Sequence, residues 1–258
     1  MKLASYADGS RDGHLVVVSR DLTQAHYATG IATRLQQVLD DWGFIAPQLE
    51  HLAVQLNHGK LRHAFAFEPE KCLAPLPRAH GWAVVEADGG VRRDAGHFAN
   101  PHQPLRAPAR AEPTLAAITG DLNAASDAAA ALDALRLLTF AVDWRLDDEL
   151  IATQAAPLAV TPDELGDAWG AGRLQARLVA LHNGAKLAPR DVAAAPGDVL
   201  ARLARLRPLR AGQVAGAALG ALDLTLAAGD SLHLDLKTTA GASLFGAIDL
   251  DIAPPPLA

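Results

Sequence analysis

Residues 110–150 decide the fold class and suggest a site: they read RAEPTLAAITGD, then a helical segment, then LLTFAVDWRLDDEL. Asp121 follows a short apolar run at a glycine turn, and Asp143 ends a second apolar run. Glu112 stands just before the first of these runs. Carboxylates at the ends of strands and turns often build a site for a hard cation. Glu112, Asp121 and Asp143 are therefore candidate ligands, although Asp is also common at such positions without any ligand.

Apolar residues at helical spacing, together with capping residues, predict the helices. They are expected at residues 33–42 and 46–59, after an N-cap at Ser126, from an N-cap at Asp198 up to Pro208, and from Thr161 to Trp169. The helix after Ser126 is expected to bury Ala130, Leu132, Leu135, Leu137 and Leu138, and the helix after Asp198 to bury Val199, Leu200, Leu203 and Leu206. The cap signature is strongest at Thr161, because Pro162 suits the first helical position and Glu164 the third.

Alternating apolar residues predict the strands. They are expected at residues 2–6, 14–19, 114–119, 175–182, 185–187, 222–226, 232–236 and 245–248. Asn183-Gly184 is expected to form a hairpin turn, because both residue types tolerate positive φ. The last three segments suggest an antiparallel sheet with one buried face. Residues 78–113 hold many glycines and prolines and are expected to be mostly loop, with Pro113 an obstacle to strand pairing.

This mixture of helices and strands predicts an α+β fold. The 258 residues are enough to bury a substantial core. A proline-rich segment at residues 68–77 suggests a boundary between two parts. We therefore expect a small N-terminal α+β domain over residues 1–77, made of a hairpin and two helices, and a larger domain over residues 78–258.

Composition excludes several classes of protein. The net charge of −6 gives no basic face for nucleic acid, and no apolar run is long enough to cross a bilayer. The one arginine cluster, formed by Arg202, Arg205, Arg207 and Arg210, is expected to be a solvated helix face. A single cysteine, Cys72, excludes an intramolecular disulfide and is expected to be buried, and the first residues lack an apolar signal segment. A cytoplasmic location is the expectation, and the abundance of alanine is typical of a high-GC bacterial source.

Five blocks of the sequence carry a family resemblance. They are KLASYADGSRDGHLVVVSRDLTQAHYAT at the N-terminus, LDDWGFIAPQLEHL, CLAPLPRA, VTPDELGDAW and, near the C-terminus, SLFGAIDLDIAP. Together they resemble the fumarylacetoacetate hydrolase (FAH) family, in particular its bacterial branch with a small N-terminal domain. The resemblance implies a mixed β-sandwich roll, usually dimeric. It also implies an active site in which four carboxylates bind Mg²⁺ or Ca²⁺ and acylpyruvate-type substrates are cleaved, or related keto acids decarboxylated, isomerised or hydrated.

The resemblance assigns the metal ligands only in part. A Glu-x-Glu motif precedes a Thr-Gly-Asp turn in the family, and here the two positions hold Glu112 and Thr114, so one carboxylate is replaced by a hydroxyl. Asp143 matches a third ligand. The fourth has its nearest equivalent in Asp94, with Asp88 as a rival. The resemblance therefore implies a vestigial site made of Glu112, Asp143 and Asp94.

The catalytic positions fit less well. His102 is the nearest equivalent of the catalytic histidine if one residue is inserted, and it lies five residues after His97 in a proline-rich stretch where histidines are usually only solvated. Leu150 stands at the position of a family lysine. Residues 215–218, Ala-Gly-Ala-Ala, stand where a Gly-Ser-Gly-Thr turn contacts the substrate carboxylate. Trp144 would crowd the pocket if it pointed inward.

These losses lead to a functional prediction. We expect a shortened, divergent family member without the metal-dependent hydrolase activity, which acts as a binding or subunit partner in a homodimer or in a heteromer with a family paralogue. No cofactor is expected, and weak Mg²⁺ or Ca²⁺ binding is the most the site would show. One alternative is an enzyme of altered chemistry, a hydrolase, decarboxylase or tautomerase on acylpyruvate-like keto acids, which uses His102 and a neighbouring acid. A second alternative is a sensor that binds a small keto acid without turning it over. A filled space between Glu112 and Asp143 would favour the partner, and an open polar cavity around His102 the enzyme.

Overall fold

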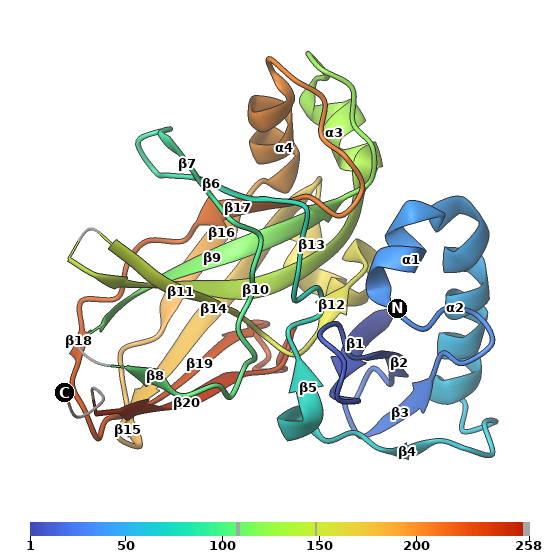
Figure 1. The fold of residues 1–258 in the computed structure, drawn as a ribbon, viewed down its shortest axis with the longest axis horizontal. Helices are drawn as coiled ribbons and strands as arrows, with labels where there is room; N and C mark the ends of the chain where they lie inside the picture. Colours follow the sequence, from blue (N-terminus) through green and yellow to red (C-terminus); the bar gives the residue numbers. More distant parts are fainter. Residues whose placement is uncertain (107–108, 148, 255–258) are drawn as a thin grey trace.

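The computed structural model describes residues 1–106, 109–147 and 149–254, and it confirms the α+β class (Figure 1). Within these residues, two β-sheets pack face to face and four α-helices lie at the periphery. The helices are α1 (Leu35–Asp40), α2 (Trp42–Asn57), α3 (Ala128–Ala134) and α4 (Pro196–Ala204). Within the described ranges, no helix has both the length and the hydropathy needed to cross a bilayer.

The larger sheet has the strand order β4-β3-β2-β1-β12-β10-β9-β17-β6-β7, and β5, β11 and β18 pair with β1, β10 and β9. Its strands are β1 (Lys2–Tyr6), β2 (His14–Val18), β3 (Gln24–Tyr27), β4 (Phe65–Ala66), β5 (Cys72–Leu73), β6 (Trp82–Val85), β7 (Val91–Asp94), β9 (Ala109–Thr119), β10 (Leu135–Leu146), β11 (Glu149–Ala155), β12 (Ala159–Val160), β17 (Val214–Ala218) and β18 (Thr225–Leu226). All neighbours are antiparallel except β6 and β17.

The smaller sheet has the order β13-β14-β19-β20-β8, and β15 and β16 also pair with β14. Its strands are β8 (Leu105–Arg106), β13 (Trp169–Gly170), β14 (Arg173–His182), β15 (Ala185–Lys186), β16 (Arg190–Ala194), β19 (Ser231–Lys237) and β20 (Ile248–Ala253). The predicted turn at Asn183-Gly184 is confirmed, since both residues have positive φ, of 51° and 76°, between β14 and β15.

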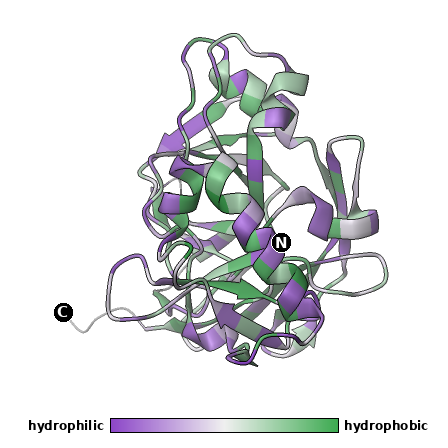
Figure 2. Ribbon diagram, turned by 90° about the vertical axis from the view of Figure 1, so that its right-hand side faces the viewer, coloured by the Kyte–Doolittle hydropathy of each residue, from purple (hydrophilic) through white to green (hydrophobic). Residues whose placement is uncertain are grey.

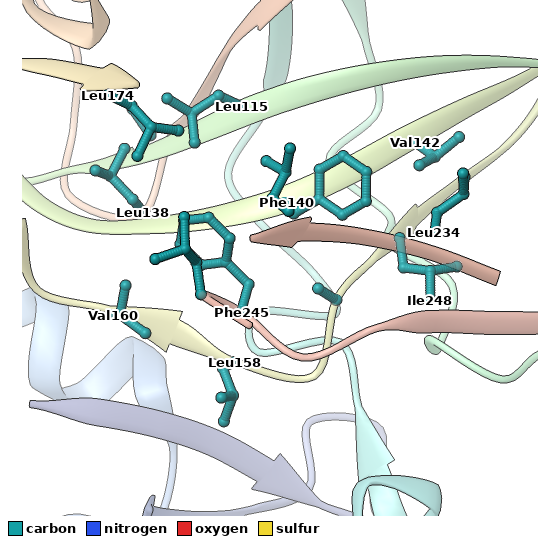
Figure 3. Close-up of a cluster of buried hydrophobic side chains, with 14 of the residues drawn as sticks. Leu115, Leu138, Phe140, Val142, Leu158, Val160, Leu174, Leu234, Phe245 and Ile248 are labelled. Carbon is teal, nitrogen blue, oxygen red and sulfur yellow. The ribbon is translucent and has the colours of Figure 1, made fainter. Parts of the chain in front are cut away.

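The main core lies between the two sheets (Figure 3). The inward side chains of β9 and β10 meet those of β14, β19 and β20 because strand residues point alternately to opposite faces. Phe140 and Phe245 are fully buried in this layer, with leucines from both sheets around them. Trp144 also belongs to this layer and is fully buried, so it points away from the face that carries Asp143.

The opposite face of the larger sheet packs on α1 and α2. The buried residues of these helices are apolar, among them Leu35 and Val38 in α1 and Leu49 and Leu56 in α2. Figure 2 colours the ribbon by hydropathy and shows hydrophobic and hydrophilic residues mixed along the helices. The first hairpin, formed by β1 and β2, is confirmed. The second helix begins at Trp42, earlier than predicted, so Pro47 lies inside it. Cys72 is buried, as expected, and burial raises the pKa of its thiol.

The larger sheet connects residues on both sides of position 77, because β1 pairs with β12. In this way residues 1–77 form one edge of the sheet that contains the candidate site. The short helix predicted at Thr161 is a 3₁₀ helix, η2 (Pro162–Ala168), with Pro162 at its first position. The Thr161 hydroxyl contacts Met1 and makes no cap hydrogen bond.

The prediction for the helix after Ser126 is wrong at both ends. Asp127 is the N-cap, since its carboxylate accepts a hydrogen bond from the N–H of Ala130. The helix ends at Ala134, and Leu135, Leu137 and Leu138 lie in strand β10. A short apolar run fits a buried strand as well as a helix, and pairing with β9 decides for the strand here.

The helix predicted after Asp198 also starts elsewhere. Ala195 is the N-cap and Pro196 takes the first position, so Asp198 lies inside the first turn of α4. The helix ends at Ala204, before Pro208. Leu206, expected to face inward, is 85% exposed because it lies beyond the last helical turn.

The segment 78–113 is more regular than predicted. It contains the hairpin of β6 and β7, turned at Gly89-Gly90, as well as β8 and the start of β9. Strand β9 passes through Pro113, which pairs with Val142. The carbonyl of Pro113 accepts from Leu219 beyond the end of β17, and the backbone nitrogen of a strand residue faces the same side as its carbonyl. The missing N–H of Pro113 therefore costs no hydrogen bond with β10.

One predicted strand near the C-terminus is also wrong. Of the segment 222–226 only Thr225–Leu226 is a strand, β18, and it pairs with β9 in the larger sheet. The strand predicted at residues 232–236 is confirmed as β19, which pairs antiparallel with β20. The strand predicted at residues 245–248 is misplaced, because β20 begins at Ile248 and runs to Ala253.

Candidate functional site

Strand pairing brings Glu112 and Asp143 side by side. Glu112 on β9 lies directly opposite Asp143 on β10, and Thr153 on β11 lies opposite Asp143 on its other side. Directly opposite residues point to the same face of a sheet. The sequence expectation that these two carboxylates meet is therefore correct in its geometry, although Asp143 lies within a strand and not at the end of one.

Asp143 is fully buried, and protein groups occupy both of its oxygens. Oδ1 accepts a hydrogen bond of 2.5 Å from the Thr153 hydroxyl and one of 3.3 Å from Trp82 Nε1. Oδ2 lies 2.6 Å from Arg92 Nη2 in a charge-assisted hydrogen bond. A buried carboxylate is tolerated when it is paired and hydrogen-bonded in this way. The chain itself thus provides the positive charge beside Asp143.

Arg92 lies at the centre of a group of carboxylates. Its Nε is 3.2 Å from Glu86 Oε1, and its Nη2 is 3.8 Å from Glu112 Oε2. Burial by itself would lower the pKa of Arg92, but attraction to Asp143, then to Glu86 and Glu112, outweighs it and raises the pKa. Arg92 therefore stays charged at every pH at which the protein folds.

Glu112 is balanced by further arginines. Arg110 Nη2 donates to Glu112 Oε1 at 2.9 Å, and Arg145 Nε lies 3.8 Å from the same oxygen. Together with Arg92, these side chains give the group formed by Glu86, Glu112 and Asp143 as many guanidiniums as carboxylates. We call these six residues the Arg92 cluster. It carries no net negative charge to attract a cation.

A divalent cation does not fit the Arg92 cluster. Mg²⁺ and Ca²⁺ need six or more oxygen ligands, and a guanidinium bonded to the most buried carboxylate excludes a second cation by repulsion. Among the residues that the structure describes, no group of three or more His, Cys, Asp or Glu side chains could hold a metal ion. No chemical step is therefore assigned to a metal in this protein.

The face next to the cluster is filled by side chains. Thr114 and Gly216 lie on β9 and β17, beside the ring of Trp82, which packs edge-on against Phe98 at 5.2 Å between ring centres. A Cβ atom added to Gly216 would lie 2.6 Å from both Thr114 Cγ2 and Trp82 Cη2. Residues 215–218, which stand where the resemblance places a substrate-binding turn, therefore have no free space in front of them at Gly216.

The other acidic candidates lie apart. Asp94 is on β7, is exposed, and bonds to the N–H of Ala95. Asp88 makes a turn in the same hairpin by accepting from Gly90 N–H. Asp121 follows the far end of β9 from Glu112, more than about 20 Å away at 3.3 Å per residue, where it contacts Arg210. The expected ligand set therefore does not come together.

His102 lies in a different place, in an open pocket of about 480 Å³ beside β19 and β20. Its Nδ1 donates to the carbonyl of Asp249 at 3.2 Å, and its Nε2 is buried without a hydrogen-bond partner. The buried Gln154 holds the loop by donating to the carbonyls of Asn100 and Gln103. His97 is exposed and does not line this pocket. His102 is therefore a fixed loop residue, and neither Glu112 nor Asp143 lines its pocket.

The same pocket contains a pair that the sequence did not reveal, His233 and Asp249. They face each other on β19 and β20, and His233 Nδ1 lies 2.6 Å from Asp249 Oδ1. This hydrogen bond raises the pKa of His233, against the opposing effect of burial. Their positions alternate with buried leucines on adjacent strands, a signal that becomes readable only when the register is known.

Because the pKa of His233 is raised, the variant His233→Gln is expected to lose stability in a pH-dependent way. A folded-state pKa above the unfolded value of about 6.5 stabilises the fold below that pH, and the stabilisation disappears as pH rises through the folded pKa. Urea unfolding should therefore show a larger destabilisation by His233→Gln at pH 5.5 than at pH 8.5. His63→Gln, which removes an exposed histidine, should show no such difference; an equal loss at both pH values would contradict the role of this ion pair.

Sequence reasoning also missed Arg92 and Trp82, the two residues that contact Asp143 from the β6–β7 hairpin. Both lie in the segment that was expected to be loop. The usable signal was the alternation of Trp82 and Val84, followed by the Gly89-Gly90 turn and a second short strand that carries Arg92. A hairpin reading would have placed Trp82 and Arg92 on the same face.

Comparison with known proteins agrees with this fold. Residues 1–78 match the model of the fumarylacetoacetase N-terminal domain 2 family. No curated protein sequence matches the chain. Three similar solved structures span nearly the whole chain, and their low sequence identities mean that they establish the fold alone.

The first is a maleylpyruvate hydrolase from Sphingobium sp. SYK-6, in complex with manganese(II) and pyruvate, with a TM-score of 0.72, 15% identity and coverage of 98% of this chain and 99% of that one. The second is a fumarylacetoacetate hydrolase from Exiguobacterium antarcticum, with a TM-score of 0.71, 16% identity and coverage of 99% and 100%. The third is a probable 2-hydroxyhepta-2,4-diene-1,7-dioate isomerase from Mycobacterium abscessus, with a TM-score of 0.72, 14% identity and coverage of 99% of each chain.

Proposed function

We propose that this chain is a member of the fumarylacetoacetate hydrolase family without metal-dependent C–C hydrolase activity. The match of residues 1–78 to the family's N-terminal domain model and the similarity of the fold support membership. In this proposal it acts as a binding or subunit partner, as a homodimer or with a family paralogue. The observation that carries the proposal is the 2.6 Å contact of Arg92 Nη2 with Asp143 Oδ2. This contact places a tethered cation against the carboxylate that the family resemblance assigns to a metal.

The contacts around Asp143 support the loss of activity. Thr153 and Trp82 occupy Oδ1 and Arg92 occupies Oδ2, so a cation would have to displace three hydrogen bonds inside a buried site. Displacement would also leave the Arg92 guanidinium near the entering cation, at a cost of several kcal/mol in a low-dielectric environment. Substrate chelation by a metal is therefore not available to this chain.

An assay with acylpyruvates tests the proposal. The purified chain, with Mg²⁺, Mn²⁺ or Ca²⁺ added, should show no hydrolysis above the uncatalysed rate, and isothermal titration should show no specific binding of these ions. Turnover that disappears in Asp143→Ala would overturn the proposal. Light scattering of the purified chain tests the dimer, and co-expression with a family paralogue tests the heteromer; a strict monomer that captures no paralogue would contradict the subunit role.

A second candidate function is the altered chemistry on keto acids. The pocket beside His102 favours it in one respect, because the paired His233 and Asp249 line this pocket. His102 itself is a poor general base, since its Nε2 is buried and its Nδ1 donates to a carbonyl. Metal-free tautomerisation of phenylpyruvate that is lost in His233→Gln would support this candidate, and its absence would remove it.

A further inference from the structure

A cavity of about 230 Å³ lies between the β6–β7 hairpin and α4, and none of the six residues of the Arg92 cluster lines it. Thr119, at the end of β9, lines it, whereas Glu112 lies near the beginning of the same strand. The hairpin is held against the helix because Arg202 donates to the carbonyl of Gly89. In Figure 1 the hairpin projects beside α4 at the same end of the molecule. The cavity is therefore enclosed by two elements that are distant in the sequence.

Two arginines reach the cavity from these two elements. Arg93 comes from β7, and Arg207 comes from the segment that follows α4. Neither side chain makes a hydrogen bond or an ion pair with any part of the chain that the structure describes. Among the described residues that line the cavity, Asp94 is the only carboxylate that opposes the charge of these two guanidiniums. An arginine is the side chain best suited to bind a carboxylate through two parallel hydrogen bonds.

The rest of the lining supplies an apolar floor and further donors. Leu203 and Leu209 are buried in the same core and line the cavity, so they offer an apolar surface to a ligand body. Gln213 accepts from Arg210 N–H through its Oε1, which leaves its amide Nε2 as a donor. His80 also lines the cavity. An apolar surface with a few convergent polar groups is the usual composition of a small-molecule site.

We propose that this cavity binds a small organic monocarboxylate with an apolar body, whose carboxylate contacts Arg93 and Arg207. The apolar body lies against Leu203 and Leu209. Asp94 disfavours ligands with a second negative charge, because like charges repel across a short distance. The volume suits a ligand the size of a single substituted ring. The arginines near α4, expected to be only a solvated helix face, thus include one residue with a binding role.

Benzoate is the probe that tests this site, and neutral benzamide is its matched control because it has the same shape without the charge. Isothermal titration of the full chain should show benzoate binding and no benzamide binding. Arg93→Gln and Arg207→Gln should each weaken benzoate at least about tenfold, the value of one lost charge-assisted hydrogen bond. Arg205→Gln, in the same segment but outside the cavity lining, should leave the affinity unchanged.

Asp94→Asn gives a change of opposite sign, since removing the opposing carboxylate should strengthen benzoate binding. The affinity of this variant for benzoate distinguishes binding at the proposed site from a general attraction of the anion to positive charge on the protein. No binding at millimolar benzoate, equal binding of benzamide, or an equal loss in Arg205→Gln would each overturn the proposal. The inference goes beyond the proposed function and does not depend on it, because the acylpyruvate assay reports on Asp143 and the benzoate titration on Arg93 and Arg207.

Discussion

Arg92→Ala is expected to lower the free energy of unfolding by about 3–5 kcal/mol, the usual cost of removing one partner of a buried ion pair. Asp143 would remain fully buried, with Thr153 and Trp82 as donors but without a positive charge in direct contact. Glu86 would also lose its ion pair with Arg92. Urea unfolding followed by tryptophan fluorescence measures the loss.

The matched control for Arg92→Ala is Arg93→Ala, one residue further along the same strand. Arg93 is exposed and unpaired within the described chain, so its removal should change stability by less than about 0.5 kcal/mol. Arg92→Lys should lose part of the stability, because an ammonium cannot reach Asp143 and Glu86 with the planar geometry of a guanidinium. If Arg92→Ala were no more destabilised than Arg93→Ala, Arg92 would not be the counter-charge of Asp143.

The Arg92→Ala protein also has a distinctive expected response to cations. Loss of the guanidinium leaves Glu86, Glu112 and Asp143 with an uncompensated charge, so Mg²⁺ or Ca²⁺ should raise its unfolding temperature by mass action. The wild-type protein should not respond, because Arg92 occupies the position beside Asp143. One substitution would thus convert the Arg92 cluster, in which arginines balance the carboxylates, into a weak cation site. A response of equal size in the wild type would contradict this account.

Local sequence patterns were sufficient to predict those elements whose structure is determined by one short segment. The β1–β2 hairpin and the Asn183-Gly184 turn are decided by residues that are close in the chain, and both were predicted. In each of these cases the residues that interact are close together in the sequence, or a known motif names both of them. Glu112 and Asp143 were named together as candidate ligands, but no pattern in the sequence predicted that they face each other across β9 and β10.

Long-range contacts explain what could not be predicted. Arg92 and Asp143 are 51 residues apart, and their contact needs β7, β6, β17, β9 and β10 to pair in one order. Residues 135–138 were predicted to be helical because a short apolar run fits both a helix and a strand. Pairing with β9 makes this segment a strand. Pro113 was expected to obstruct strand pairing because proline has no N–H to donate. Whether that N–H is needed depends on which neighbouring strand the backbone nitrogen faces, and this follows from the strand register, which no local sequence pattern reveals.

Phe140→Ala is expected to cause a large loss of stability in the core. Phe140 is fully buried in β10 and lies between the sheets with Leu234 and Ile248 from the smaller sheet (Figure 3). Removing a buried phenyl ring loses its transfer free energy and leaves a cavity, with a combined cost of about 3–5 kcal/mol. Strands on both sides restrict collapse into the cavity, which favours the upper end of that range.

Phe44→Ala provides the comparison for Phe140→Ala, since it removes the same ring from α2, where the side chain is 70% exposed. Its expected effect on the free energy of unfolding is below about 0.5 kcal/mol, because little apolar surface is returned to water. Urea denaturation of both variants measures the difference. Phe140→Leu should recover part of the loss, since leucine refills some of the volume. A small effect of Phe140→Ala with a large one of Phe44→Ala would mean that the sheets do not pack through Phe140.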